Sequence, residues 1–298
     1  MSDFLVLDEP AVQQRLRYED LIPVIADALA ALASGRVVQP VRAVLPVAQH
    51  GGFFGVMPAY AGALGAKLVT FYPKNVGMHT HHAVIVLFKA ETGEPLALMD
   101  GRLITEMRTA AASAVATQHL ARPEASVLAI LGSGVQAKSH LLALRHVRTF
   151  KEVRVWSPRH AAEFAQRHGV KAAASAEDAV RGADVVVVAA SATTPILQGR
   201  WLAPGTHVNA IGATRPDWRE LDDDVVTKAR VFVDSREAAL RESGDVIAAK
   251  SEITEIGAVV AGTAQGRQNS KETTLFKSVG VAVEDVAAAA LTLERRAR

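Results

Sequence analysis

The chain has 298 residues, of which 49% are apolar, so it is long enough to bury one large core or two medium ones. Its 33 basic and 31 acidic residues give a net charge of +2, which leaves no electrostatic footprint for nucleic-acid binding. It contains no cysteine, which excludes disulfides, thiolate zinc sites and cysteine nucleophiles.

The N-terminal residues predict a protein without a targeting segment. The acids Asp3 and Asp8 stand where a signal peptide carries Lys or Arg. No apolar run approaches the roughly 18 residues that a transmembrane helix needs. We therefore expect a soluble, cytoplasmic protein with no membrane partner.

The first stretch, to about residue 118, has the pattern of an α+β domain. A helical pattern over residues 11–33 precedes strand-like runs at 38–47, 52–57, 66–71 and 83–88, with turn signals between them. An Ala-rich helix is predicted over residues 105–120. Helices followed by several strands are typical of an α+β arrangement.

The second stretch alternates strands and helices. Apolar strands are predicted at 126–131, 152–156, 184–190, 207–211 and 231–233, with helices at 136–148 and 160–168. Apolar strands that alternate with helices indicate a parallel sheet covered on both faces, so we expect an α/β, Rossmann-type doubly wound domain. The last stretch, 273–298, is expected to be mostly helix.

A glycine-rich loop follows the first strand of this second stretch. It consists of Gly132, Ser133, Gly134, Val135, Gln136 and Ala137, between a predicted buried strand and a predicted helix. In a dinucleotide-binding loop the first glycine permits the tight turn and the second lets the backbone approach the pyrophosphate. A small third residue lets the helix pack closely, and the helix N-terminus faces the phosphates. We interpret the loop as a nicotinamide-dinucleotide site rather than an ordinary strand-to-helix turn.

The end of the second predicted strand favours NADPH as the cofactor, with NADH as the other candidate. An acid about 20 residues after the glycine loop normally holds the ribose hydroxyls of NAD. Here Trp156 is followed by Ser157, Pro158, Arg159 and His160, with no acid among them. The hydroxyl of Ser157 and the guanidinium of Arg159 suit a ribose phosphate. The alternative is that Arg159 simply points into solvent.

Three basic residues of the first stretch, Arg42, Lys67 and Arg108, lie in apolar surroundings. Strand alternation indicates that Lys67 points inward, where a cation needs a partner. That partner is either a structural carboxylate or the carboxylate of a substrate. Arg108 is expected near the start of its helix, where the helix dipole favours an anion.

Three histidines, His79, His81 and His82, cluster in the same stretch. His79 and His81 could share a strand face and bind a metal. No acid or cysteine nearby completes a ligand set, so we predict no metal site and interpret them as polar residues near a pocket.

A set of short segments carries a pattern that extends in order over nearly the whole chain. The segments are residues 39–42, 55–60, 67–72, 99–101, 108–111, the glycine loop, 209–223, 242–246 and 276–280. Taken together, they resemble the ornithine cyclodeaminase/mu-crystallin family, and within it the mu-crystallin branch of ketimine reductases.

The resemblance implies a homodimer with two domains per chain. Residues 1–118 and 271–298 would form the substrate-binding and dimerisation domain, and residues 119–270 the Rossmann domain. Arg42, Lys67 and Arg108 would surround the substrate carboxylate. Ser191 and Thr193 would join the glycine loop at the cofactor.

One departure from the family pattern bears on the reaction. The cyclodeaminases carry Asp where this chain has Thr214. Thr214 cannot act as a carboxylate base at pH 7, so the resemblance favours a reductase over the ammonia-releasing lyase. Asp217 lies three residues on and could substitute, so the lyase stays an alternative.

The predicted activity is NAD(P)H-dependent reduction of a cyclic ketimine carboxylate, such as Δ1-pyrroline-2-carboxylate or Δ1-piperideine-2-carboxylate, to the cyclic amino acid. Lys67 is the candidate proton donor, and Arg42 and Arg108 would orient the carboxylate. The alternatives are an amino-acid dehydrogenase or iminosuccinate reductase, ornithine cyclodeaminase, and a non-catalytic, NADPH-gated small-molecule binding protein.

Overall fold

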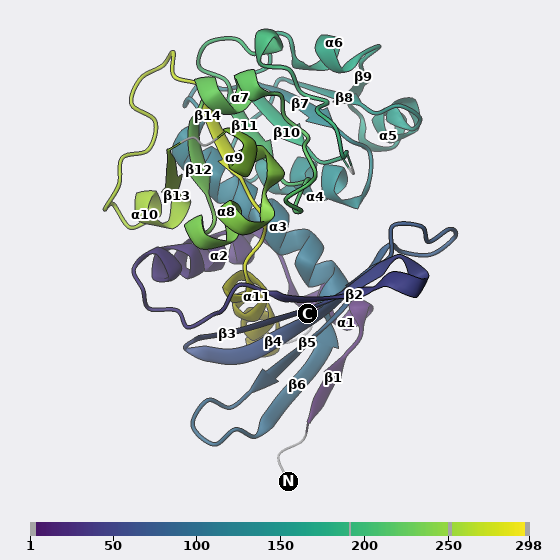
Figure 1. Ribbon diagram of the computed structural model, residues 1–298, viewed down its shortest axis with the longest axis vertical. Helices are drawn as coiled ribbons and strands as arrows, with labels where there is room; N and C mark the ends of the chain where they lie inside the picture. Colours follow the sequence, from purple (N-terminus) through teal and green to yellow (C-terminus); the bar gives the residue numbers. More distant parts are fainter. Residues whose placement is uncertain (1–3, 191, 250–251, 296–298) are drawn as a thin grey trace. The chain divides into compact units, whose positions relative to one another are not determined.

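The computed structural model describes residues 4–190, 192–249 and 252–295, and the chain divides into two compact units (Figure 1). Unit 1 comprises Met1–Arg108 and Gly280–Arg298, and unit 2 comprises Thr109–Val279. From the sequence, we expected the chain to pass from one domain to the other near residues 118 and 271. Among the described helices, none has the length and apolarity that crossing a bilayer requires.

Unit 1 is built on a six-stranded mixed sheet. Its order is β1-β6-β5-β4-β3-β2, with β1 parallel to β6 and every other neighbouring pair antiparallel. The strands are β1 (Leu5–Leu7), β2 (Ala43–Val47), β3 (Gly52–Ala61), β4 (Ala63–Phe71), β5 (His81–Phe88) and β6 (Pro95–Asp100). This confirms the predicted α+β character.

Helices cover one face of that sheet. Helix α11 (Ala282–Glu294) packs on β3, β4 and β5, and α2 (Tyr18–Ala33) packs on α11. The single helix expected over 11–33 is instead divided, because Leu16 is extended and ends α1 (Glu9–Arg15). Asp8 begins α1 by accepting a hydrogen bond from the Ala11 N–H. The short 3-10 turn η1 (Ala48–His50) joins β2 to β3.

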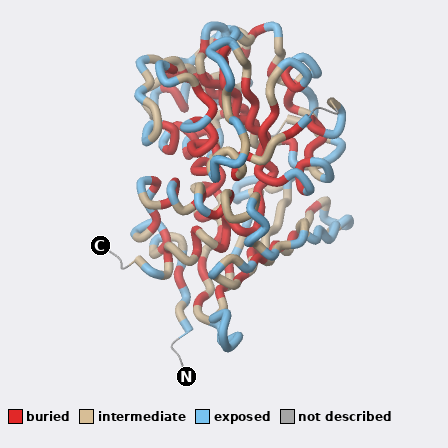
Figure 2. The backbone as a smooth tube through the Cα atoms, turned by 90° about the vertical axis from the view of Figure 1, so that its left-hand side faces the viewer, coloured by how far each residue is buried: buried red, intermediate tan, exposed pale blue. Residues whose placement is uncertain are grey.

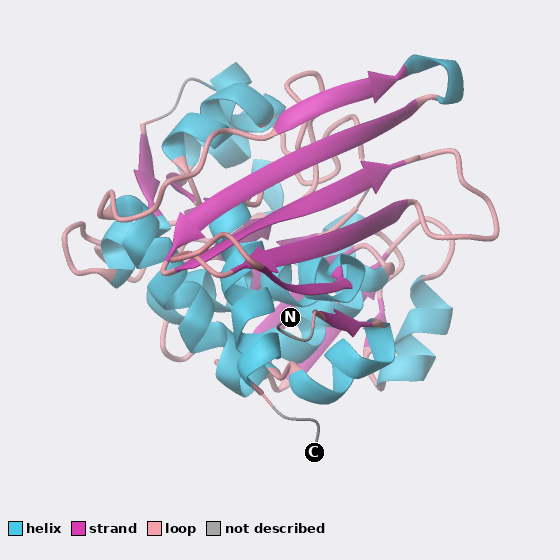
Figure 3. Ribbon diagram, turned by 90° about the horizontal axis from the view of Figure 1, so that it is seen from below, coloured by secondary structure: helices cyan, strands magenta, loops and turns pink. Residues whose placement is uncertain are grey.

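The other face of the sheet is largely apolar. Residues that pair directly across neighbouring strands share a face. Figure 3 looks onto the long strands of this sheet. The residues of this face are partly or fully exposed, and they include the polar Thr70, His82 and Asp100 beside the apolar Ala43, Leu45, Phe54, Val56, Pro58, Tyr60, Leu64, Ala66, Leu68, Val84, Val86, Phe88 and Leu98.

Unit 2 is an eight-stranded, all-parallel sheet in the order β13-β12-β14-β11-β10-β7-β8-β9. This confirms the predicted Rossmann-type sheet. Its central strands are fully buried, in red in Figure 2. The strands are β7 (Val127–Leu131), β8 (Glu152–Trp156), β9 (Lys171–Ala172), β10 (Val185–Val188), β11 (His207–Ala210), β12 (Arg230–Val233), β13 (Ile253–Glu255) and β14 (Thr274–Lys277).

The connections of unit 2 are mostly helical. Helix α3 (Gly101–Leu120) begins in unit 1 and ends in unit 2. The other helices are α4 (Val135–Leu144), α5 (Ala161–His168), α6 (Ala176–Val180), α7 (Asp223–Lys228), α8 (Arg236–Glu242), α9 (Gly244–Ala249), α10 (Ile256–Val260) and the 3-10 turn η2 (Gly199–Trp201).

One sequence-based expectation is confirmed only in part. The stretch from residue 273 contains the expected helix, α11, but it begins with strand β14, which lies between β11 and β12. All four of its residues are buried, Lys277 included. A strand of four residues is too short to show a clear period, and a lysine within it hides its burial.

Candidate active site

The glycine loop lies at the carboxyl end of β7 and begins α4. Gly132 has φ +134°, and a Cβ on it would overlap the carbonyl of Ala189, which follows β10. Gly134 is the N-cap of α4, and a Cβ there would meet nothing within 4 Å. Ala137 is fully buried, so its small side chain lets the helix pack closely. The loop therefore has the close turn, the open approach and the helix N-terminus that a pyrophosphate needs.

The strand order places this loop at a topological switch point. From β7 the chain continues to β8 and β9 on one side, whereas β10 and β11 lie on the other. Ligands of open parallel sheets bind at such a point, outside the carboxyl ends of the strands. The Gly132 N–H donates to the Trp156 carbonyl at 2.8 Å, which brings the end of β8 beside the loop.

The residues predicted to hold the ribose phosphate follow β8 directly. Ser157 is half-buried, and its Oγ accepts from the His160 N–H at 3.2 Å. Arg159 is exposed and makes no ion pair with any residue the structure describes. Its guanidinium is thus free to meet a ligand at this edge.

The two residues predicted after β10 differ in outcome. Ser191 lies outside the described residues. Thr193 is exposed, and its carbonyl accepts from the Arg219 N–H at 3.3 Å. Thr193 therefore lies at the carboxyl edge of the sheet. There, the segment after β10 contacts the loop after β11.

Unit 1 brings Lys67 and Arg108 together around one carboxylate. Nζ of Lys67 lies 2.7 Å from Oδ2 of Asp285, and Nε of Arg108 lies 2.8 Å from Oδ1 of the same residue. Nη1 of Arg108 also contacts Glu284 Oε2 at 2.7 Å. All four side chains are buried. The partner that sequence reasoning left open is therefore a structural carboxylate, contributed by the first turn of α11.

Arg42 belongs to the same cluster. It donates from Nη2 to the Gly280 carbonyl at 2.5 Å, and its charge acts on Lys67. The guanidinium of Arg108 lies against Gly280, where a Cβ would come within 2.7 Å of it. We call Arg42, Lys67, Arg108, Glu284 and Asp285 the cationic cluster.

Burial lowers the pKa of Lys67 to about 7, with the charge of Asp285 raising it and those of Arg108 and Arg42 lowering it. An amine with this pKa exchanges its proton readily near neutral pH, as a general acid must. Burial raises the pKa of Asp285, but Arg108 and Lys67 outweigh that effect and hold it below its usual value.

The expected position of Arg108 near a helix start is wrong. Helix α3 begins at Gly101, so Arg108 lies two turns inside it, beyond the reach of the dipole at that terminus. Helix α3 begins earlier than the apolar pattern indicates. Asp100 caps it there by accepting a hydrogen bond from the Leu103 N–H.

Thr214 lies in the loop after β11 and is exposed. The preceding residue, Ala213, has φ +50°, which is strained for a residue other than glycine. A strained residue persists only where its surroundings hold it in place, so the turn that presents Thr214 is held by its neighbours. Such strain is concentrated at functional sites.

Sequence reasoning missed the carboxylates of both units. Glu284 and Asp285 belong to a helix far along the chain from Lys67, and Glu220 and Asp245 pair with Lys277 in unit 2. The signal for Glu284 and Asp285 was two acids at the start of an apolar helix, a pattern equally typical of a solvent-exposed first turn.

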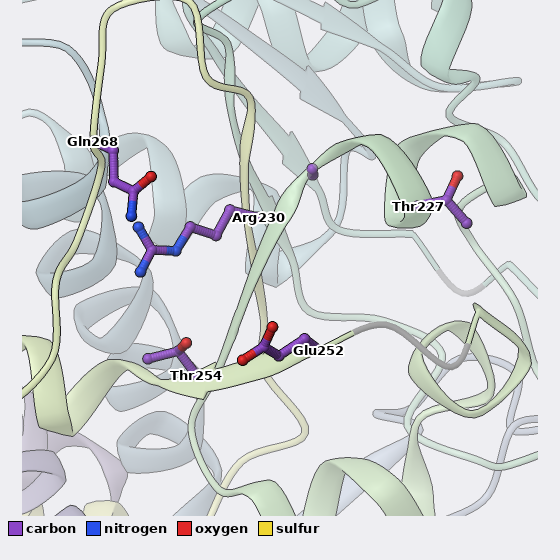
Figure 4. Close-up of a pocket in the computed structure, with 6 residues that line it drawn as sticks. Thr227, Arg230, Glu252, Thr254 and Gln268 are labelled. Atoms are coloured by element: carbon purple, nitrogen blue, oxygen red, sulfur yellow. The ribbon is translucent and has the colours of Figure 1, made fainter.

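A hollow lies on unit 2, away from the glycine loop. Figure 4 shows the residues that line it: Thr227, Ala229, Arg230, Glu252, Thr254 and Gln268. Arg230 begins β12, so the hollow lies at the amino ends of these strands, opposite the edge where parallel sheets bind ligands. The guanidinium of Arg230 donates hydrogen bonds to the carbonyls of Gly266 and Gln265. We assign no function to it.

The fold and the site together define a protein with a Rossmann-type dinucleotide-binding unit and a second unit that carries a buried cationic cluster. The chain matches the model of the ornithine cyclodeaminase/mu-crystallin family over residues 3–298. It belongs to that family.

Named relatives and solved structures are similar to this chain over nearly its whole length. The chain is 48% identical to the ketimine reductase mu-crystallin of Rattus norvegicus, over 98% of this chain and 96% of the relative. It is similar to the Δ1-pyrroline-2-carboxylate reductase of Thermococcus litoralis in complex with NADH and L-proline, with 37% identity, a TM-score of 0.93 and 98% and 97% of the two chains covered. An archaeal alanine dehydrogenase dimer with bound NAD is 34% identical, with a TM-score of 0.92 and coverage of 98% and 95%.

Proposed function

We propose that this protein reduces the C=N bond of a cyclic ketimine carboxylate to the corresponding cyclic amino acid with a nicotinamide cofactor. Substrates of this class include Δ1-pyrroline-2-carboxylate and Δ1-piperideine-2-carboxylate. The observation that carries the proposal is the cationic cluster, in which a buried lysine with a pKa of about 7 lies beside two arginines.

The cluster suits the binding of a carboxylate. Arg42, Lys67 and Arg108 bring three cationic groups together, and Glu284 and Asp285 hold two of them. Because these groups are already in place, a substrate carboxylate would be oriented at little entropy cost. Arginine suits the planar, bidentate recognition of that group.

The residues of the chain have distinct tasks in this reaction. Arg42 and Arg108 bind and orient the substrate carboxylate, so that the imine approaches in one pose. Lys67 supplies the proton at the imine nitrogen from Nζ, directly or through water. The glycine loop fits a dinucleotide, and the nicotinamide supplies the hydride when it is bound. Asp285 keeps Lys67 and Arg108 in place.

NADPH is the proposed cofactor, although the two solved structures compared above hold NADH or NAD. Arg159 is exposed directly after β8, and no acid stands there to repel a ribose phosphate. Ser157 adds a hydroxyl donor at the same edge.

The protein is proposed to be a homodimer that uses the apolar outer face of the six-stranded sheet of unit 1. A contiguous exposed apolar surface marks an interaction site, and closed two-fold dimers are the commonest assembly. The archaeal relative compared above is a dimer. The cytoplasmic location stays a prediction of the sequence.

The test is NADPH and NADH oxidation with a panel of preformed cyclic ketimine carboxylates. Turnover of at least one ring size is expected, without release of ammonia. Absence of turnover on every ring, with cofactor still bound tightly, would point to the non-catalytic binding protein and overturn the proposal.

A second candidate is an amino-acid dehydrogenase, which the likeness to an alanine dehydrogenase favours. It would reduce an acyclic imine formed from a 2-oxoacid and ammonia. Comparing kcat/KM for pyruvate plus ammonia with that for a cyclic ketimine decides between them. Faster turnover of pyruvate plus ammonia would replace the first proposal.

Ornithine cyclodeaminase is tested separately, because Thr214 stands where that enzyme type carries an acid. The protein is expected to release no ammonia from ornithine. Cofactor-dependent proline formation from ornithine would make the lyase the correct assignment.

A further inference from the structure

Unit 2 contains a second buried charge cluster, which no step of the proposed reaction uses. Nζ of Lys277 lies 2.7 Å from Glu220 Oε1 and 3.2 Å from Asp245 Oδ2, and all three side chains have no exposed surface. Burial lowers the pKa of Lys277, but the two carboxylates more than offset this and raise it, so the lysine stays charged. We call these three residues the lysine triad.

Every member of the triad contacts the loop at residues 212–219 or a segment joined to it. Lys277 donates from Nζ to the Gly212 carbonyl. Oδ1 of Asp245 accepts from the backbone N–H groups of Glu220 and Leu221, each at 3.1 Å. A Cβ on Gly212 would overlap the carboxylate of Glu220. The triad therefore packs directly beneath the strained turn at Ala213.

A second close approach holds the far side of the same loop. The Gly244 N–H donates to the Arg215 carbonyl at 3.1 Å, and a Cβ on Gly244 would overlap the Trp218 carbonyl. Asp245 is the residue after Gly244 in α9, so one short segment both supports the loop and supplies a triad carboxylate. Three segments far apart in the sequence, 209–223, 242–246 and 276–280, thus meet at one buried point.

The loop lies beside the switch point, on the side away from β8, where open parallel sheets have their ligand-binding crevice. It follows β11, and a Cβ on Gly212 would lie 2.5 Å from the carbonyl of Ala190, after β10. The Arg219 N–H donates to the Thr193 carbonyl. Since the adenosine ribose lies at the end of β8 in such folds, the β10 and β11 side is left for the nicotinamide half.

We infer that Lys277, Glu220 and Asp245 are positioning residues that hold the 212–219 loop, and with it Thr214, against the nicotinamide half of the bound cofactor. The inference rests on the proposed function in one respect, that a nicotinamide dinucleotide occupies the crevice. A buried ion cluster seldom adds net stability over apolar packing, so its presence calls for another explanation. Fixing a backbone turn in one strained conformation is such an explanation.

The principal variant is Glu220→Gln, which keeps the shape and an acceptor oxygen but removes the carboxylate that contacts Lys277. The matched control is Glu152→Gln, which removes a carboxylate held by Lys171 and Arg154 on β8. Two cofactor probes are used: NADH, and ADP-ribose, which lacks the nicotinamide ring.

Glu220→Gln is expected to weaken NADH binding about tenfold, equivalent to about 1.4 kcal/mol, and to change ADP-ribose binding by less than about twofold. Amide hydrogen exchange over residues 212–219 should accelerate, and kcat for a cyclic ketimine should fall more than its KM rises. The Glu152→Gln control should match wild type in every measurement. Lys277→Met, which removes the donor to Gly212, should act in the same direction when it folds.

Two results would overturn the inference. One is NADH affinity and loop exchange that match wild type in Glu220→Gln. The other is an equal loss for NADH and ADP-ribose, which would indicate general destabilisation. Failure of the proposed function looks different: wild-type protein that binds NADH but reduces no imine leaves the binding and exchange comparison intact.

Discussion

Nζ of Lys67 lies 2.7 Å from Oδ2 of Asp285, and neither side chain is accessible to solvent beyond 2%. The other oxygen of Asp285 accepts from Arg108. One carboxylate of α11 thus fixes two cations from separate elements, β4 and α3. In the proposed function, a substrate carboxylate would meet cations that are already in place, which lowers the entropy cost of orienting it.

Lys67→Met should reduce kcat/KM for a cyclic ketimine at least about a hundredfold, the scale of a lost general acid. Cofactor affinity should change little, because the glycine loop belongs to unit 2. Steady-state kinetics and cofactor titration measure both quantities. Lys89→Met, which removes an exposed lysine paired with Glu94, is the control. Near-normal turnover in Lys67→Met would exclude Lys67 as the proton donor.

Asp285→Asn should move the pH profile of kcat/KM. With burial holding the pKa of Lys67 at about 7, the protonated donor is lost as the pH rises through 7. The charge of Asp285 raises that pKa, so its removal should shift the fall in activity to lower pH. An unshifted profile would mean that the ionisation belongs to another group. Asp20→Asn, at a carboxylate paired with Arg295, should leave the profile unchanged.

The same lysine makes stability depend on pH. Its folded-state pKa lies below its unfolded value, so the unfolded chain binds more protons between about pH 7 and 10.5. The Lys67 contribution to the free energy of unfolding should therefore be largest above that window and fall as the pH drops toward 7. Lys67→Met should lack this slope in denaturant titrations at several pH values.

Arg108→Leu should weaken the binding of an imine carboxylate far more than the binding of a decarboxylated cyclic imine. The loss of a charged hydrogen bond costs about 1.5–3 kcal/mol. The variant also removes the guanidinium that contacts Glu284 and leaves Asp285 with Lys67 alone of its two cations, so a fall in stability of about 3–5 kcal/mol is expected. Inhibition constants for the two ligands separate the effects. Equal weakening of both would mean that the residue serves only the fold.

The two glycines of the loop should respond differently to alanine. In Gly132→Ala the new methyl group would overlap the Ala189 carbonyl and φ is +134°, so thermal stability should fall. Gly134→Ala has open space, so stability should persist while the methyl group obstructs the approach of the pyrophosphate. Melting temperature and NADPH affinity check both. Unchanged cofactor binding in Gly134→Ala would place the pyrophosphate elsewhere.

Arg159→Ala should reduce NADPH affinity about ten- to a hundredfold, since one charge-assisted contact contributes about 1.5–3 kcal/mol. NADH lacks the phosphate, so its affinity should hardly change. Dissociation constants for both cofactors, on wild type and variant, are the measurement. A wild type that prefers NADH, or equal losses for the two cofactors, would show that Arg159 does not bind a phosphate.

The sequence could predict what local pattern determines. Strand β8 matches its predicted bounds, and the glycine loop stands between a strand and a helix as expected, because strand length and turn chemistry are encoded locally. The partner of Lys67 could not be predicted, because Asp285 reaches it only after α11 packs on the sheet. Strand β14 was missed because four buried residues carry no periodicity, and Lys277 is buried only through carboxylates from two other segments.

The late position of β14 and α11 in the chain has a consequence for synthesis. On the ribosome, β11 and β12 emerge well before β14, the strand that must come between them. The face of β3, β4 and β5 likewise stays uncovered until α11 follows. Domains usually fold in turn as a chain emerges, the N-terminal one first. Here neither unit can complete its core until the final segment has been made. Both nascent cores therefore expose apolar surface together for most of translation, and a chain truncated before Thr274 would leave both unfinished.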